Sequence, residues 1–222
     1  MTVLHLADEG EAADLAAFLS RLLHYDRGAA VRLQAAGTAL AVFGRPPSFE
    51  VLAIRAVRLA KPYENGLDVT LDVTVSAGEL LESVDEAGAT AAVPGAVTGP
   101  PWAGVLPPRG GWRTEPGLPA PDALRSLVAA AVAEFRSRTQ ELPDERRTRA
   151  ELDRIGRDIW SRTVGDTRLP VRAVHAAQSL GFLRPGAPLG LFSSGAWLRL
   201  RTPYGSIAVR RAGLGALDVS VR

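Results

Sequence analysis

Residues 88–121 are the part of this 222-residue chain that most constrains its fold, because fifteen of these 34 positions are glycine or proline. Proline removes a backbone hydrogen-bond donor and glycine loses much entropy on ordering, so such a stretch does not hold a helix or strand for long. Trp102 and Trp112 lie within it, in the run PPWAGVLPPRGGW. A free linker has no use for two large aromatic rings. We therefore expect a connecting segment that its tryptophans pin to the rest of the protein.

The first segment, residues 1–87, is expected to be an α+β unit with a helix and a four-stranded antiparallel meander. The helix is expected over Asp8–Leu23, where apolar residues recur with helical spacing and acids crowd the first turn. The strands are expected at Ala30–Gln34, Thr38–Phe43, Glu50–Leu59 and Leu67–Val75. Apolar and polar residues alternate along the last of these, which is typical of an antiparallel sheet with one buried face. Ser76 and Glu79 form a capping box that opens a short helix, Ala77–Val84.

Residues 122–222 are expected to form three helices followed by strands. The helices are expected at Ala123–Arg138 after an Asp122 cap, at Glu145–Arg162 and at Pro170–Leu180. The strands are expected at Pro188–Phe192, Ala196–Arg201, Ser206–Arg211 and Gly215–Val221. Helices and strands are segregated rather than alternating, so the fold class is α+β: an N-terminal helix plus antiparallel meander, then a helical segment followed by a C-terminal antiparallel sheet.

Charge is divided unevenly along the chain. Residues 1–120 hold 9 Lys/Arg against 14 Asp/Glu, a net charge of −5, whereas residues 121–222 hold 17 against 10, a net charge of +7. From Thr167 to Leu217 there are seven arginines and no acid. Arginine outnumbers lysine 25 to one, which suggests a coding bias. The preference for arginine over lysine therefore does not by itself indicate bidentate contacts with an anion. A long stretch of one sign in a folded region usually has an anionic partner, most commonly nucleic acid.

The candidate partner-binding surface is built from this basic region. Trp197, Arg199 and Arg201 share one face of their strand, and Leu198 and Leu200 share the other, because side chains alternate along a strand. An aromatic residue interleaved with arginines is typical of surfaces that bind nucleic acid. The predicted partner-binding residues are Arg168, Arg172, Trp197, Arg199, Arg201, Arg210 and Arg211.

Two alternatives use the same residues differently. Helices followed by strands that a turn joins resemble a winged-helix module, in which Pro170–Leu180 would enter the major groove and the strand pair would be the wing. Arg168 and Arg172 would then lie at the entry of the recognition helix, and the later arginines would contact phosphates. Alternatively, the opposed charges of the two parts are satisfied against each other, inside the protein or between subunits. Trp102 and Trp112, if exposed, would then be anchors for a protein partner.

No catalytic, metal-binding or nucleotide-binding motif stands out. The chain has no cysteine, and His5, His24 and His175 occur in no ligand spacing. Asp68 and Asp72 share a strand face, but four residues at about 3.3 Å each separate them too far to act as an acid–base pair. We therefore predict no catalytic residue and no cofactor, and a non-enzymatic binding or regulatory protein that acts through a macromolecular partner. An enzyme whose site is assembled from scattered residues is the alternative.

The strings LPPRGGW and GAWLRLRTPYGSIAVRR resemble those of uncharacterised proteins of high-GC actinobacteria. That resemblance implies a bacterial cytoplasmic protein and carries no known activity, cofactor or functional residue. The first residues, MTVLHLADEGEAAD, are acidic and lack the features of a signal peptide, and the longest apolar stretch is too short to span a bilayer. We predict a cytoplasmic location and no membrane contact. The predicted partner is a protein or a second copy of the chain, with nucleic acid as the other candidate.

Overall fold

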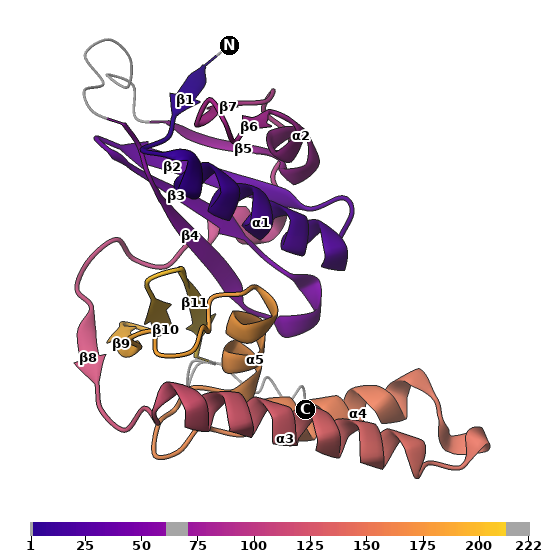
Figure 1. Cartoon of the computed structure of the whole chain (residues 1–222). Helices are drawn as coiled ribbons and strands as arrows, with labels where there is room; N and C mark the ends of the chain where they lie inside the picture. The colour runs from indigo at the N-terminus through magenta and orange to yellow at the C-terminus, as the bar shows by residue number, and fades with distance from the viewer. Residues whose placement is uncertain (1, 61–70, 212–222) are drawn as a thin grey trace, which may run out of the picture.

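The computed structural model describes residues 2–60 and 71–211, and it confirms the predicted α+β class. Figure 1 shows strands from both parts of the chain with helices lying against them, and a long helical pair extending from one end of the molecule. The predicted strand Gly215–Val221 lies outside the described residues, as do Asp68 and the beginning of the predicted strand Leu67–Val75.

The N-terminal half, residues 2–104, contains the predicted helix and meander. The helix is α1 (Glu9–Tyr25), which Asp8 caps by accepting the Glu11 N–H at 2.9 Å. The four strands are β2 (Ala30–Ala36), β3 (Ala39–Gly44), β4 (Leu52–Arg58) and β5 (Asp72–Ser76). Ser76 caps the predicted short helix, α2 (Ala77–Glu82). The remaining elements are β1 (Val3–His5), the 3-10 helix η1 (Pro47–Phe49), β6 (Val84–Asp85), β7 (Thr90–Ala92) and the 3-10 helix η2 (Pro101–Gly104).

The C-terminal half, residues 107–211, contains the three predicted helices. They are α3 (Pro121–Gln140), α4 (Arg149–Trp160) and α5 (Val171–Ser179), with the 3-10 helix η3 (Asp144–Arg146) before α4. The strands are β8 (Arg113–Glu115), β9 (Gly190–Ser194), β10 (Trp197–Thr202) and β11 (Gly205–Arg210). Helices α3 and α4 form the long helical pair of Figure 1.

Two of these helices begin elsewhere than predicted. α3 begins at Pro121, because proline at the first helical position costs no hydrogen bond, and Asp122 lies within the first turn instead of capping it. α4 begins at Arg149, because the Thr148 hydroxyl accepts the Glu151 N–H at 3.3 Å. Thr148 and Glu151 have the spacing of a capping box, so the start signal of α4 was present in the sequence.

The two halves share one antiparallel sheet, whereas the sequence predicted two. Its strand order is β5-β2-β3-β4-β11-β10-β9-β8, and a separate small sheet has the order β1-β7-β6. At its centre, Leu52–Ile54 of β4 pair with Ser206–Ala208 of β11. In the N-terminal half α1 is followed by the meander β2-β3-β4, and in the C-terminal half α5 is followed by the meander β9-β10-β11. In each meander the third strand lies at the centre of the sheet, and the first strand pairs with an outer strand, β5 or β8. The strand order is therefore symmetric about the β4–β11 pair.

A single hydrophobic core lies between the sheet and the helices. α1 and α5 pack on the same face of the sheet, and the Phe18 ring of α1 stacks on Phe182, just after α5, with 5.6 Å between ring centroids. Buried side chains of α3 and α4, among them Leu124, Val128 and Ile159, join the same core. The halves are therefore one packed unit rather than two domains with separate cores.

The opposite face of the sheet, called here the open face, carries no α-helix of the described residues. Residues 97–112, the crossing segment, run over it from one edge to the other. At the β5 edge the Val97 N–H donates to the Thr74 carbonyl at 2.9 Å, and near the β8 edge the Ser194 hydroxyl donates to the Gly110 carbonyl at 3.2 Å. In between, Trp102 and Leu106 pack on a second apolar cluster made of Phe43, Leu52, Ile54 and Ala208. The packing at Trp102 thus holds the crossing segment against the sheet.

Candidate partner-binding surface

Strand β10 presents Trp197, Arg199 and Arg201 on the open face. The alternate residues, Leu198 and Leu200, are at most 1% exposed and belong to the core on the helix side. Arg210 of β11 pairs directly with Trp197 and therefore lies on the open face as well. The structure thus brings together four of the seven predicted residues, called here the basic face: Trp197, Arg199, Arg201 and Arg210.

Two further aromatic rings border the basic face. The guanidinium of Arg199 lies 5.6 Å from the centroid of the Trp112 ring, at the end of the crossing segment. Phe192 of β9 pairs with Arg199, and Gly190 pairs with Arg201. A Cβ atom on Gly190 would lie 2.7 Å from the Phe192 ring, so the ring occupies the space that a side chain at Gly190 would fill. Both rings are half-buried.

The charge of the basic face is not neutralised by the described part of the chain. Within residues 2–60 and 71–211, no carboxylate forms an ion pair with Arg199, Arg201 or Arg210, and the Nε of Arg199 is buried without an acceptor. Burial lowers the pKa of the Arg199 guanidinium below its usual value, and the charge of Arg201 lowers it further. A desolvated cation beside a second cation is stabilised when an anion binds.

The other three predicted residues lie elsewhere. Arg168 is exposed in the loop between α4 and α5, and Arg172 lies on α5, on the helix side of the sheet. Arg211 lies just after β11, where its guanidinium donates to the Gly195 carbonyl and closes the β9–β10 turn. The separation follows from strand pairing and helix packing, which put the loop before α5 and the open face on opposite sides of the sheet.

The winged-helix alternative is wrong. Five of the nine residues of α5 are buried against the core, namely Val171, Ala173, Val174, Ala176 and Ala177, so the helix is part of the core packing rather than a free recognition helix. The strands of the proposed wing lie within the eight-stranded sheet, because β11 pairs with β4 on its far edge.

The opposed charges of the halves meet at one place. Arg184 donates to Asp14 of α1 at 3.2 Å and lies 3.8 Å from the centroid of the Tyr204 ring. This is the single ion pair between the halves within the described ranges. Next to it, the buried Arg55 donates to Glu11 at 3.1 Å, to Asp14 at 3.2 Å and to the Tyr204 carbonyl at 2.7 Å. The cluster ties the halves together and leaves the basic face unneutralised.

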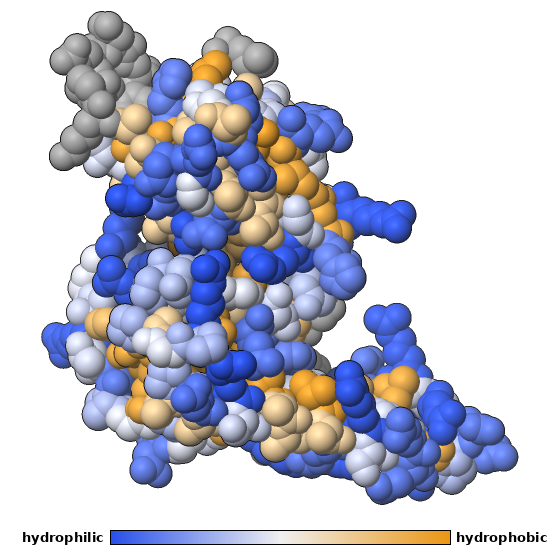
Figure 2. Space-filling model, viewed as in Figure 1, coloured by the Kyte–Doolittle hydropathy of each residue, from blue (hydrophilic) through white to orange (hydrophobic). Residues whose placement is uncertain are grey.

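A row of aromatic rings, which the sequence did not predict, lies on the helix side of the molecule. Successive rings lie 4.6–6.1 Å apart between centroids, and they come from α1, η1, α5, α4 and α3: His24, Tyr25, Phe49, His175, Trp160 and Phe135. Figure 2 shows this side of the molecule hollowed between the N-terminal body and the helical pair α3–α4. His175 stacks on Trp160, and no carboxylate hydrogen-bonds to it among the described residues.

The position of His175 predicts a pH-dependent stability. Burial lowers the pKa of His175 below its ordinary value of 6.5. As the pH falls from about 7 to 5, the unfolded chain takes up a proton at this side chain before the folded protein does, so the free energy of unfolding falls. We expect the Tm of the wild type to fall over this range more than that of a His175→Phe variant, which keeps the stacked ring. Equal pH dependence of the two proteins in thermal melts would contradict this.

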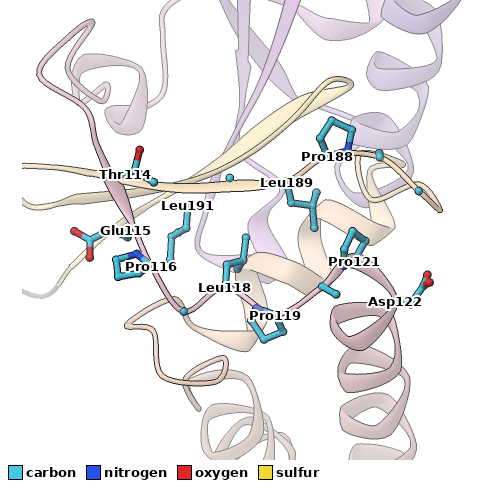
Figure 3. Close-up of a pocket in the computed structure, with 15 residues that line it drawn as sticks. Thr114, Glu115, Pro116, Leu118, Pro119, Pro121, Asp122, Pro188, Leu189 and Leu191 are labelled. Atoms are coloured by element: carbon cyan, nitrogen blue, oxygen red, sulfur yellow. The ribbon is translucent and has the colours of Figure 1, made fainter.

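A cleft of about 600 Å³ lies beside the sheet edge, between residues 114–122 and 186–191. Figure 3 shows Leu118, Pro119, Pro121 and Leu189 around its centre, whereas Glu115 and Asp122 lie at opposite ends and point away. Glu115 accepts a hydrogen bond from the Ser193 hydroxyl. No histidine is among the residues that line the cleft, and its two carboxylates, Glu115 and Asp122, lie at opposite ends of it.

The described residues form neither a metal-binding cluster nor a membrane-spanning helix. No group of three or more His, Cys, Asp or Glu side chains is placed to hold a metal ion in the described part of the chain. None of the described helices has the length and apolar character needed to cross a membrane.

Two family models match the chain, and the boundary between them coincides with the boundary between the two halves of the sheet. Residues 1–104 match the family model "Domain of unknown function (DUF8010)", and residues 107–214 match "Domain of unknown function (DUF8185)". The first model covers β5-β2-β3-β4 and the second covers β11-β10-β9-β8, so each corresponds to four strands of the shared sheet. No curated protein matches the chain significantly. The predicted actinobacterial origin stays a prediction.

The fold resembles a sliding clamp. The crystal structure of a DNA polymerase sliding clamp from Pseudomonas aeruginosa, solved with a ligand, superposes with a TM-score of 0.51 at 13% sequence identity. The match covers 95% of this chain and 65% of the clamp chain, so this chain spans less than two thirds of that protein. At this identity the likeness concerns the fold.

Proposed function

We propose that this chain, whose fold resembles that of a sliding clamp, is a non-enzymatic protein that binds an anionic macromolecule through the basic face. The observation that carries the proposal is the convergence of Arg199, Arg201 and Arg210 on one face of the sheet without a neutralising carboxylate among the described residues. The DNA polymerase sliding clamp to which the fold is similar is, by its name, a partner of another macromolecule, which supports a binding role.

The shape of the surface favours a polymer over a small anion. Arg199 and Arg201 are two residues apart on one strand and Arg210 lies on the next, so their charges are spread over a sheet surface rather than gathered in a pocket. Such an arrangement suits a partner with several negative charges in a row. Phosphate contacts of this kind release counterions, and they make affinity depend steeply on salt.

The test is a salt-dependent titration of labelled single-stranded and duplex DNA, followed by fluorescence anisotropy at about 50 and 200 mM salt. We expect the wild type to bind, with an affinity that falls as salt rises. When Arg201 and Arg210 are both replaced by glutamine, the slope of log affinity against log salt concentration should become shallower by about two. Arg136→Gln is the matched control, since Arg136 is exposed on α3, on the protruding helical pair. No binding of either polymer by micromolar protein at low salt, or an equal loss in the control, would overturn the proposal.

A second copy of the chain is the other candidate partner. Exposed acids of the N-terminal half, among them Glu79, Glu82 and Glu86, form no ion pair within the described ranges, so they are available to neutralise the basic face of a neighbouring molecule. Sedimentation velocity in the same two buffers, without DNA, distinguishes this case, because it predicts oligomers that dissociate at the higher salt.

A further inference from the structure

We infer that the basic face takes single-stranded nucleic acid, with bases stacked on Trp112 and Phe192 and the phosphate backbone on the arginines. The inference rests on the proposed function of the basic face and names its partner. It is carried by the juxtaposition of rings and guanidinium groups over strands β8 to β11.

Each ring of this surface has a guanidinium as its neighbour. Trp112 lies over Arg199, Phe192 pairs with Arg199 across β9 and β10, and Trp197 pairs with Arg210 across β10 and β11. Neighbouring cross-strand positions lie about 5 Å apart, which brings a stacking ring and a phosphate-binding group within one nucleotide of each other. An acidic peptide would use the arginines but has no flat group for the rings.

The rings are held in place before any ligand binds. The indole N–H of Trp112 donates to the Pro108 carbonyl at 3.0 Å, and the Ser194 hydroxyl holds the neighbouring Gly110 at 3.2 Å. Gly190 leaves room for the Phe192 ring to lie along β9. Rings that are already ordered lose little entropy when a base stacks on them, so the arrangement favours binding.

A duplex fits this surface less well than a single strand. In a duplex the bases are stacked on one another and show only their edges, whereas a single strand can place its bases on protein rings. A major groove is read by a helix or a two-stranded ribbon that enters it, and the basic face is part of a broad sheet beside the crossing segment. Trp112 and Phe192 would therefore have no base to stack on in a duplex.

The experiment compares three labelled polymers with equal numbers of phosphates: oligothymidylate, the same backbone without bases, and a duplex of half the length. We expect oligothymidylate to bind at least about tenfold more tightly than the abasic strand or the duplex. Trp112→Leu and Phe192→Leu keep an apolar side chain without a ring face. Each is expected to weaken oligothymidylate binding on the order of tenfold and to leave abasic binding within about twofold.

Two controls separate stacking from charge and from folding. The Arg201→Gln/Arg210→Gln variant is expected to weaken the binding of all three polymers. Trp160→Phe changes a tryptophan of the helix side and is expected to leave all three affinities unchanged. Quenching of tryptophan fluorescence by oligothymidylate, reduced in Trp112→Leu, is the independent readout.

The outcomes are distinguishable. Equal affinity for the strands with and without bases, or tightest binding of the duplex, overturns this inference and leaves the proposed function standing. The same holds if the leucine variants bind oligothymidylate like the wild type. Failure of all three polymers to bind overturns both.

Discussion

Replacing Arg55 by methionine is expected to destabilise the protein by about 3 kcal/mol, because the change removes a buried cation and takes one donor from each of its three acceptors. Arg55 is 5% exposed, and its guanidinium serves Glu11, Asp14 and the Tyr204 carbonyl. Methionine fills a similar volume, so the loss comes from the broken charge pairing rather than from a cavity. Urea denaturation, followed by circular dichroism, measures the change in the free energy of unfolding.

Arg58→Met is the matched control. Arg58 also donates to Glu11, at 2.8 Å, but its side chain is 71% exposed, and solvent screens its charge. We expect this variant to lose much less stability than Arg55→Met. Equal losses in the two variants would contradict the view that burial makes the Arg55 cluster important to the junction of the halves.

Phe18→Ala is expected to cost about 3–5 kcal/mol and to weaken both halves together. Phe18 is 1% exposed and stacks on Phe182, which belongs to the C-terminal half. All four tryptophans lie at or after residue 102, so their fluorescence reports on the crossing segment and the C-terminal half. If the halves share one core, tryptophan fluorescence and far-ultraviolet circular dichroism should report the same decrease in the free energy of unfolding.

An exposed change in the same helix supplies the comparison for this prediction. Ser20→Ala, on the solvent side of α1, is expected to shift neither transition by more than about 0.5 kcal/mol. Two separate transitions for Phe18→Ala, with the fluorescence midpoint unchanged, would show that the halves unfold independently.

Local features of the fold could be predicted from the sequence because neighbouring residues decide them. The predicted Ser76 cap of α2 lies next to the Glu79 N–H that it satisfies. The sharing of one face by Trp197, Arg199 and Arg201 follows from the period of a strand and needed no knowledge of its partners. The position of Arg211 could not be predicted in this way, because it depends on where β11 ends.

Features that depend on distant contacts could not be predicted. The union of the two predicted sheets depends on the β4–β11 pair, and Arg55 and Tyr204, which meet beside it, are 149 residues apart. The row from His24 to Phe135 draws its rings from five elements, and no local spacing relates them. The α4 cap is different, because the capping box of Thr148 and Glu151 could have been recognised in the sequence. Pro143 and Asp144, which also favour a helix start, led to a predicted start that was too early.

The β4–β11 pair also sets an order of events during synthesis. β4 occupies the centre of the finished sheet, yet its β11 partner is translated about 150 residues later, which takes roughly 10 s or more at ribosomal rates. Throughout that interval β4 is the unpaired edge strand of the N-terminal meander, and it carries apolar side chains, including those of Leu52 and Ile54. An edge of this kind is a template for intermolecular pairing. The crowded polysome, rather than the finished protein, is therefore where this chain is most exposed to aggregation.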